Sequence, residues 1–372
     1  MKKTKKCCEG KVKERLGKVG GQAVLEGVMM KAGERTVTTC RKEDGTIVVN
    51  DDVFVTIRKK HKFLNAPILR GVVNFVEMMI LSFKTLGVSA EALDIDDEND
   101  KKKKEEGKKT TTDIVMAIGL ILGVLLAVGL FILLPGLVSD LVEYLVGRFS
   151  DFTINETLKA VIEGVAKVII FVTYLALVAL MPDIKRTFMY HGAEHKSIAC
   201  FEAGAELTPE SAKNYTRFHP RCGTSFMFVM ILIGIAVGII LNNVFPDMNR
   251  FVLSAIRLLI LPLVVGIGYE FIMFAGKHDN FVTRALSAPG LWMQKITTRE
   301  PTLDMLEIAI ISIKCALRDE FPEFKEYYDN CGWITKVDEE STENEPFEND
   351  EKDAEAKAPC DSAESTADKD YE

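Results

Sequence analysis

The chain has 372 residues, a net charge of −8 and a 48% share of hydrophobic residues, although 27% of its residues are charged. Apolar and charged residues must therefore be segregated, and long uncharged stretches do alternate with dense lysine and acidic runs. The eight cysteines show no repeated spacing, which excludes a small disulfide-bonded scaffold and favours free thiols in a reducing compartment.

Both ends of the chain are strongly charged. Residues 1–19 are basic and residues 335–372 are acidic, and such tails are normally solvated and disordered. No apolar run follows the basic end at signal-peptide distance, so no cleavable signal is expected. We interpret the basic end as a cytoplasmic orientation signal, and nucleic-acid binding is the less favoured alternative.

Residues 20–66 are predicted to form a small β-rich cytoplasmic region. An apolar run at 23–30 follows two glycines. Two β-branched segments, 36–40 and 46–49, then flank an Asp-Gly turn, which is a strong hairpin signal. Residues 53–57 are expected to add a further strand.

Residues 67–92 have the pattern of an amphipathic helix at the membrane. Arg70, Asn74 and Glu77 share one face, and apolar side chains cover the others. A helix packed against a soluble core fits the same pattern equally well. A charged linker, 93–112, follows.

Four segments are predicted to cross a membrane as a bundle within residues 113–276. Three of them are long enough for the roughly 20 residues that a bilayer core requires and carry few charges or none: 114–138, 223–245 and 251–276. The fourth, 159–181, includes Lys159, Glu163 and Lys167. These three share one helical face and are expected to pair with each other, away from lipid.

Lysine and arginine indicate the orientation of these segments. They are frequent in the N-terminal part, the linker, the 182–222 loop and residues 277–334, and sparse in the other two loops. The positive-inside rule therefore makes both termini cytoplasmic. The sequence predicts a mainly α membrane protein with about four transmembrane helices, a small N-terminal β-hairpin region and cytoplasmic amphipathic helices, partnered by the lipid bilayer.

The 182–222 loop contains the residues that favour metal chemistry. Residues 186–201 are predicted to be helical, so His191 and His195 emerge from one face, one turn apart, with Glu194 beside them. H-x-x-E-H is typical of inverted zincins, in which the histidines bind zinc and the glutamate is the general base. We expect the same roles here.

Two further candidate ligands follow in the same loop. Pro220 forces His219 out of helical geometry, so His219 and Cys222 are expected on a turn before the third span. Together with the helical pair they could complete a tetrahedral zinc site, although iron, cobalt or copper would also accept such ligands. Two alternatives remain open: a structural cluster of polar side chains, and an anion or lipid-headgroup site formed with Lys196 and nearby arginines.

Other polar residues are candidates for orienting a ligand or contacting a substrate. Glu202 lies seven residues after His195, about 10 Å along the helix, so it is placed outside the ligand set. Glu270 is an ionisable group inside an apolar segment, and a structural ion pair with Arg70 is the alternative to a functional role. Glu26 stands beside a glycine, where a plain turn is the simpler interpretation. The complete set of such candidates is Glu202, Arg217, Arg221, Glu270, Glu26 and Arg70.

Several motifs resemble, in the same order, those of the YqhQ-like family, a bacterial group defined by a domain of unknown function. They are Gly20–Met30, Arg70–Asn74, His191–Lys196, Arg217–Ser225 and Pro289–Trp292. The resemblance covers roughly residues 18–318. It implies a multi-pass protein of the bacterial plasma membrane, often labelled a metal-dependent enzyme, and the His, Glu and Cys candidates stand at motif positions.

Two functions from different classes follow. The first is a zinc-dependent membrane hydrolase, peptidase-like, that acts on an unknown protein or peptide near the membrane. The second is a non-enzymatic scaffold or accessory factor in membrane-protein assembly or transport, with a closed structural zinc site. A transporter is less favoured because there is no inverted repeat.

Overall fold

The computed structural model describes residues 15–93, 111–150, 152–246, 248–275 and 281–322. Most of the basic tail, most of the charged linker and the whole acidic tail therefore lie outside the described residues, and their predicted disorder stays a prediction.

The N-terminal region is a four-stranded antiparallel sheet rather than a single hairpin. Its strands are β1 (Val19–Val24), β2 (Gly27–Ala32), β3 (Arg35–Arg41) and β4 (Ile47–Val53), and they pair in chain order. The predicted hairpin is β3–β4, with Cys40 opposite Val48. The apolar run that looked continuous is divided by a tight turn at Glu26, whose φ of 48° reverses the chain and creates a second hairpin.

The prediction of a strand at 53–57 is wrong. β4 ends at Val53, and the short 3-10 helix η1 (Ile57–Lys59) begins instead. Thr56 caps this helix through its side chain, and the Glu77 carboxylate accepts the Ile57 N–H at 2.7 Å. These local partners satisfy backbone groups that a strand would have to pair with a neighbour.

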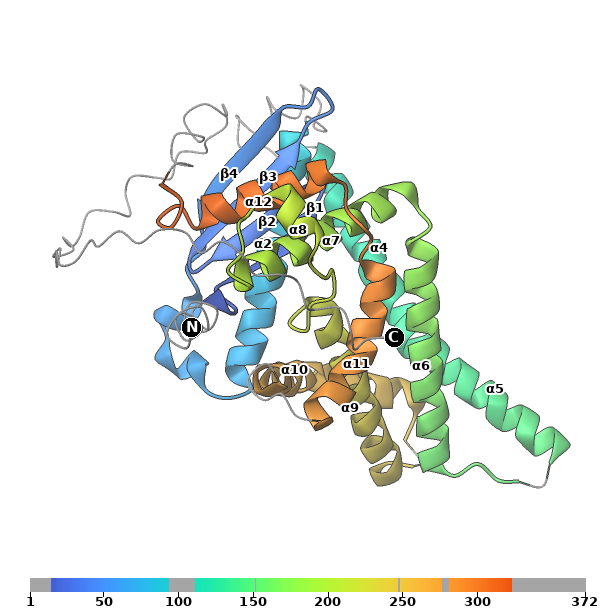
Figure 1. Ribbon diagram of the computed structural model, residues 1–372. Coiled ribbons are helices and arrows are strands. Elements are labelled where there is room, and N and C mark those ends of the chain that lie inside the picture. Colours follow the sequence, from blue (N-terminus) through green and yellow to red (C-terminus); the bar gives the residue numbers. More distant parts are fainter. Residues whose placement is uncertain (1–14, 94–110, 151, 247, 276–280, 323–372) are drawn as a thin grey trace. The chain divides into compact units, whose positions relative to one another are not determined.

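The sheet is the middle layer between helices. On one face it packs against α7 (Pro182–Glu202) and α12 (Leu303–Ala316), and on the other against α2 (Leu69–Ala92) (Figure 1). The short helix α8 (Pro209–Lys213) packs against α7 and α12. Because successive side chains of a strand point to opposite faces, Val28 and Met30 join the first core and Met29 joins the second. This explains why three successive residues of β2, Val28, Met29 and Met30, are apolar.

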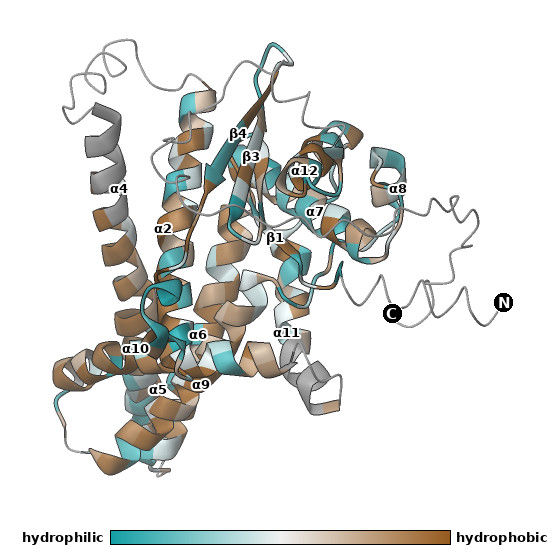
Figure 2. Ribbon diagram, turned by 90° about the vertical axis from the view of Figure 1, so that its left-hand side faces the viewer, coloured by the Kyte–Doolittle hydropathy of each residue, from teal (hydrophilic) through white to brown (hydrophobic). Residues whose placement is uncertain are grey.

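The remaining long helices are mostly apolar, as the brown colouring of their ribbons in Figure 2 shows. They are α4 (Thr111–Val128), the π-helical turn η3 (Gly129–Leu133), α5 (Leu134–Phe149), α6 (Glu156–Val178), α9 (Gly223–Val244), α10 (Arg250–Ala275) and α11 (Phe281–Thr297). The first predicted span therefore continues beyond residue 138, through η3 into α5.

Within the described residues, five helical segments, rather than the predicted four, are long and apolar enough to cross a membrane. They are Leu69–Ala92, Ile121–Phe149, Glu156–Val178, Gly223–Val244 and Phe251–Phe274. The additional one is α2, because its polar stripe is too narrow to lower its mean hydropathy. Leu81 and Ala92 on α2 are buried in the core against the sheet, so one side of this helix has a protein partner.

The charged residues of α6 pair mainly with other helices, not with each other as predicted. Lys159 Nζ lies 2.6 Å from Glu143 of α5, and Glu163 binds Arg257 of α10. Within α6, Lys167 and Glu163 approach only to 3.9 Å. An ion pair with a neighbouring helix turns the charged side chain toward that helix. An i, i+4 pair within α6 would not bring it into contact with the neighbouring helix.

Candidate metal centre

The two histidines of α7 face the same point. Helical spacing of four residues brings their rings to 4.4 Å between centroids. His195 is 2% exposed, and burial lowers the pKa of its imidazole, although Cys222 opposes this shift. The lowered pKa favours the neutral imidazole, which is the form that metal ligation requires.

Backbone carbonyls orient both rings. His191 Nδ1 lies 2.8 Å from the Thr297 carbonyl oxygen, and His195 Nδ1 lies 2.5 Å from that of Arg217. Because a carbonyl only accepts, each Nδ1 must carry the proton and each Nε2 keeps a free lone pair. Ligating histidines commonly donate their second N–H in this way.

Cys222 completes a group of three possible ligands. It is the N-cap residue of α9, and its Sγ lies 3.3 Å from His191 Nε2. The donor atoms of His191, His195 and Cys222 all lie within 4.8 Å of one another. Two imidazoles and one thiol are donors that suit zinc, and three protein ligands leave a fourth position for water or substrate.

His219, which the sequence predicted as a ligand, lies beside this group. Its ring is 5.5 Å from that of His195, and its Nε2 lies 3.3 Å from Arg221 and 3.8 Å from a Glu202 oxygen. Gln294 holds its backbone, accepting the His219 N–H and donating to the His219 carbonyl, each at 2.8 Å. In this arrangement His219 belongs to a neighbouring Glu-Arg network.

Glu194, the predicted general base, is buried between α7 and β1. It is 5% exposed. Burial raises the pKa of its carboxyl group to about 7, and the positive potential of His191 and the Gly21 N–H only partly offset that rise. A carboxyl group with a pKa near neutrality can both accept and return a proton at physiological pH.

Two glycines allow the backbone to approach this site closely. A Cβ atom on Gly192 would lie 2.0 Å from the Arg299 carbonyl oxygen, and one on Gly21 would lie 2.5 Å from the Met29 carbonyl oxygen and 3.2 Å from Glu194 Cγ. Gly192 therefore lets the segment after α11 lie close to α7, next to Thr297, whose carbonyl oxygen contacts His191. Gly21 lets β1 cover Glu194.

Three other candidates surround the three-residue group. Glu202 forms an ion pair with Arg221 and accepts the Gly17 N–H at 2.7 Å. Burial raises the Glu202 pKa, but hydrogen bonds from His219 and Gly17 and the charge of Arg221 outweigh it, so the net shift is downward. Arg217 contributes its carbonyl to His195 and pairs with Glu300 at 3.2 Å. Of the three, Arg217 contacts the candidate ligand His195, whereas Glu202 and Arg221 contact His219.

The last three candidates connect elements. Glu26 occupies the β1–β2 turn, pairs with Arg186 and accepts from the Tyr190 hydroxyl, which ties the sheet to α7 just before His191. Glu270 accepts hydrogen bonds from Arg70 at 2.5 and 2.7 Å and so links α10 to α2. This is the ion pair with Arg70 that the sequence suggested as the structural alternative to a functional role.

The sequence did not indicate two residues that shape the site. Gln294 is fully buried and holds His219, and it could have been suspected as a polar residue on the apolar side of a helix. Thr297 acts through its main-chain carbonyl, for which a side chain gives no signal.

Comparison with known proteins places the chain in a family. Residues 66–319 match the family model described as "Protein of unknown function (DUF1385)". The chain is 34% identical over 309 residues to "Uncharacterized protein YqhQ" of Bacillus subtilis (strain 168), covering 81% of this chain and 92% of that protein. No solved structure matches it. The matched region contains the complete His191, His195 and Cys222 group, and the chain belongs to the DUF1385 family of YqhQ-like proteins.

Proposed function

We propose that the chain is a metal-dependent hydrolase of the bacterial plasma membrane, with both termini and the metal site on the cytoplasmic side. Long apolar helices and the lysine and arginine pattern support the membrane assignment. On α4, α5 and α10 many large apolar side chains, such as Leu125, Leu141 and Leu259, are exposed, which suits a lipid environment.

The observation that carries the metal assignment is the convergence of three donor atoms with both histidine tautomers fixed. His191, His195 and Cys222 would hold a divalent ion, zinc by the chemistry of the donors. When bound, such an ion supplies Lewis acidity and makes water a stronger nucleophile near neutral pH. Because the set has three protein ligands, it favours a metal ion whose fourth coordination position is open to water or substrate over a closed site with four protein ligands.

Glu194 is the proposed general base. It stands one helical turn after His191, and its carboxyl group has a pKa of about 7. It would accept a proton from the attacking water and return it to the amine nitrogen that leaves when the peptide bond breaks. The substrate would be an unknown protein or peptide near the membrane. Arg217 and Arg221 would keep the ligand-bearing loop in position through Glu300 and Glu202.

A non-enzymatic scaffold or accessory factor in membrane-protein assembly or transport is the second candidate. It is favoured by the nearness of His219, whose ring lies 5.5 Å from His195. A rotation of that ring away from Glu202 would add a fourth protein ligand and close the site. Such a site would stabilise the fold without catalysis.

The first experiment measures metal content by mass spectrometry in the purified full chain. About one zinc per chain, absent in His191→Ala/His195→Ala and retained in the exposed control His61→Ala, is the expected result. Absence of metal from the folded wild-type protein after zinc reconstitution would remove the metal assignment.

The second experiment tests hydrolysis separately. Peptide N-termini are sequenced in membranes containing wild type or Glu194→Gln. We expect termini that depend on wild type and disappear both with the variant and with a chelator. If Glu194→Gln retains zinc and the set of termini is unchanged, the hydrolase assignment fails and the scaffold function replaces it.

A further inference from the structure

The connection between β4 and α2 carries a dense positive charge. It contains η1 and a second short 3-10 helix, η2 (Lys62–Asn65), and residues 57–65 are called the η1–η2 segment below. The sequence contains no acidic residue between Asp52 and Glu77. Neither short helix contains a buried residue. The cations of the segment, which the surroundings of the protein therefore meet directly, are Arg58, Lys59, Lys60 and Lys62.

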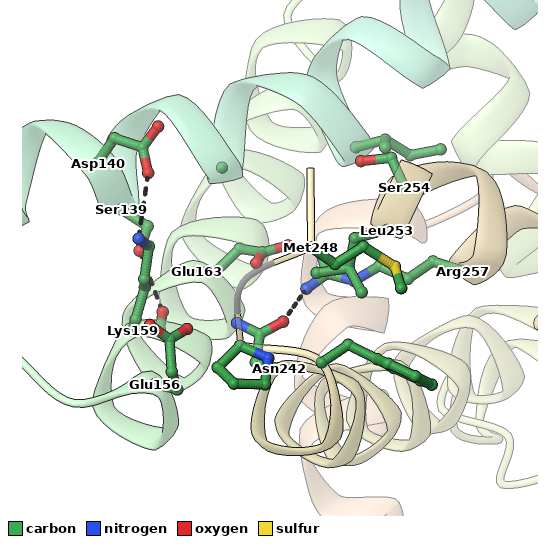
Figure 3. A pocket seen from close by; sticks show the side chains of 14 residues that line it. Ser139, Asp140, Glu156, Lys159, Glu163, Asn242, Met248, Leu253, Ser254 and Arg257 are labelled. Atoms are coloured by element: carbon green, nitrogen blue, oxygen red, sulfur yellow. Dashed lines mark hydrogen bonds and ion pairs between the residues drawn. The ribbon is translucent and has the colours of Figure 1, made fainter. Parts of the chain in front are cut away.

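Cations between the apolar helices are in a different situation, because they are paired. Figure 3 shows a cavity of about 240 Å³ between α5, α6, α9 and α10, in which Lys159 reaches Asp140 and Arg257 reaches the side chain of Asn242. A ligand that entered this cavity would have to displace such a contact. These charges therefore hold helices together.

The lysines of the η1–η2 segment remain available to an external anion. Lys59 lies 2.5 Å from a carboxylate oxygen of Glu34, and both side chains of that pair are well exposed. Lys60 and Lys62 are exposed, and within the described residues no carboxylate pairs with either of them. They can bind an anionic surface without the loss of an existing ion pair.

Large apolar side chains stand exposed among these cations. Phe63 is 68% exposed, and Ile57 is 52% exposed. In water such side chains gain nothing from burial. At a membrane surface an aromatic ring can enter the apolar region while lysine side chains of the same segment reach back to the headgroups. The combination therefore suits a membrane surface better than bulk water.

The end of the segment is fixed against α10. A Cβ atom on Gly266 would lie 2.7 Å from the Ile68 carbonyl oxygen, so only glycine permits this approach. Arg70 Nε then donates to Glu270 at 2.7 Å. Ile68 has a φ of 68°, a conformation that β-branched residues rarely adopt. Tertiary packing against α10 therefore sets this junction, because the local preference of isoleucine opposes it.

The segment lies on the same side of the helical bundle as the metal centre. The Phe75 ring of α2 is 6.0 Å from that of Phe226, which stands about one helical turn after Cys222 on α9. Farther along α2, Thr85 accepts a hydrogen bond from Gln22 of the sheet at 2.5 Å. The start of α2 therefore lies where the apolar helices meet the layer of the sheet (Figure 1).

We propose that the η1–η2 segment is a docking surface for a bilayer that contains anionic phospholipids. Its lysines bind lipid phosphate groups, and Phe63 inserts among the acyl chains. Clusters of four or more Lys and Arg next to a membrane-spanning segment are typical of anionic-lipid binding. Docking holds the sheet, and with it the histidines of α7, close to the membrane. The inference rests on the membrane assignment of the proposed function, but not on metal binding or hydrolysis.

The test places one tryptophan in the segment and measures its contact with lipid. Phe63→Trp is introduced into the full chain with Trp292→Phe and Trp333→Phe, which removes the two native tryptophans. Nanodiscs contain equal phosphatidylglycerol and phosphatidylcholine, with acyl-chain bromine on one lipid or on the other. The control carries Glu43→Trp instead, in the exposed β3–β4 turn at the opposite end of β3 from Glu34. We expect loss of fluorescence at position 63, more from brominated phosphatidylglycerol, and no loss at position 43.

Two matched double variants test the role of the lysines. Lys60→Gln/Lys62→Gln, added to the position-63 reporter, should make quenching by the two brominated lipids equal. Lys84→Gln/Lys213→Gln removes the same charge from exposed positions on α2 and α8 and should leave the preference for phosphatidylglycerol intact. High salt should reduce that preference in the reporter itself, because exposed charges are screened.

Alkaline carbonate extraction of the same membranes separates two kinds of failure. Release of the chain into the soluble fraction would remove the membrane assignment of the proposed function, and this inference with it. A chain that stays in the membrane while position 63 is quenched by neither lipid would overturn the docking surface alone and leave the cations to a soluble anionic partner. Equal quenching by both lipids before any lysine is changed would overturn the selectivity for anionic headgroups.

Discussion

His191 Nε2 lies 3.3 Å from Cys222 Sγ, although the two residues are 31 positions apart and belong to different helices. The contact is held from both sides, since the Thr297 carbonyl fixes His191 and the start of α9 fixes Cys222. This relationship selects Cys222 over His219 as the third donor, and it makes the two residues experimentally distinguishable.

Cys222→Ser and His219→Ala should therefore affect metal affinity unequally. Loss of an outer contact to a ligand lowers affinity by about 10–100-fold, so His219→Ala should lose no more than that. Cys222→Ser removes a donor and should lose more. Zinc affinity is measured by competition with a chromophoric chelator. Equal losses in the two variants would indicate a closed four-ligand site.

Gly192→Ala should destabilise the protein. The new Cβ would lie 2.0 Å from the Arg299 carbonyl oxygen, so the crossing segment must move, at a cost of about 1–3 kcal/mol. Gly87→Ala is the matched control, because Gly87 is helical with open space around it and alanine is the better helix former. Denaturant unfolding of the solubilised protein should show a lower unfolding free energy for Gly192→Ala and a higher one for Gly87→Ala. Equal changes in the two variants would contradict the close approach of the Arg299 carbonyl to Gly192.

Gln294→Met should loosen the loop that carries His219. The side chain has similar length but cannot make the two hydrogen bonds to the His219 backbone, which leaves buried partners unsatisfied at a cost of about 1–3 kcal/mol. Limited proteolysis of the 214–222 segment should become faster. Unchanged stability and proteolysis would show that Gln294 does not hold this loop.

Stability of the metal-free protein should fall as pH rises through neutrality, and Glu194 should cause part of that fall. Its folded pKa of about 7 exceeds the ordinary value of 4.5, so the folded state retains a proton that the unfolded chain releases. The stabilisation that the protonated Glu194 carboxyl group gives to the folded state is complete below about pH 4.5 and is lost above pH 7. The difference between the folded and unfolded pKa corresponds to about 3 kcal/mol of unfolding free energy.

The check is the difference in unfolding free energy between pH 5 and pH 8. Wild type should lose about 2–3 kcal/mol more than Glu194→Gln over this interval, because glutamine does not titrate. Other groups titrate in both proteins and cancel in the comparison. Parallel pH profiles would show that Glu194 is ionised in the folded protein at both values.

Much of the local structure could be predicted from short-range patterns. The β3–β4 hairpin follows from an Asp-Gly turn between β-branched segments, and the helix predicted over residues 186–201 lies within α7. The tight turn at Glu26 could not be predicted this way. A non-glycine residue with positive φ is stabilised by tertiary partners, here Arg186 and Tyr190, which no local pattern reveals.

The number of long apolar helices depends on partners as well as composition. Sequence alone identifies α9 and α10 because apolar runs of that length are typical of segments that span a bilayer. α2 has enough apolar residues to count as a fifth, yet its Leu81 and Ala92 are buried in the core against the sheet. Periodicity shows that a face is apolar, but not which surface covers it.

For the candidate site, the sequence by itself determined that His191 and His195 share one helical face, since four residues are close to one turn. It also determined that Glu194 accompanies them and that His219 and Cys222 follow in one loop. Only the tertiary structure decided which of those two turns toward the pair. That choice rests on Gln294 and on the carbonyls of Arg217 and Thr297, which long-range packing brings to the site.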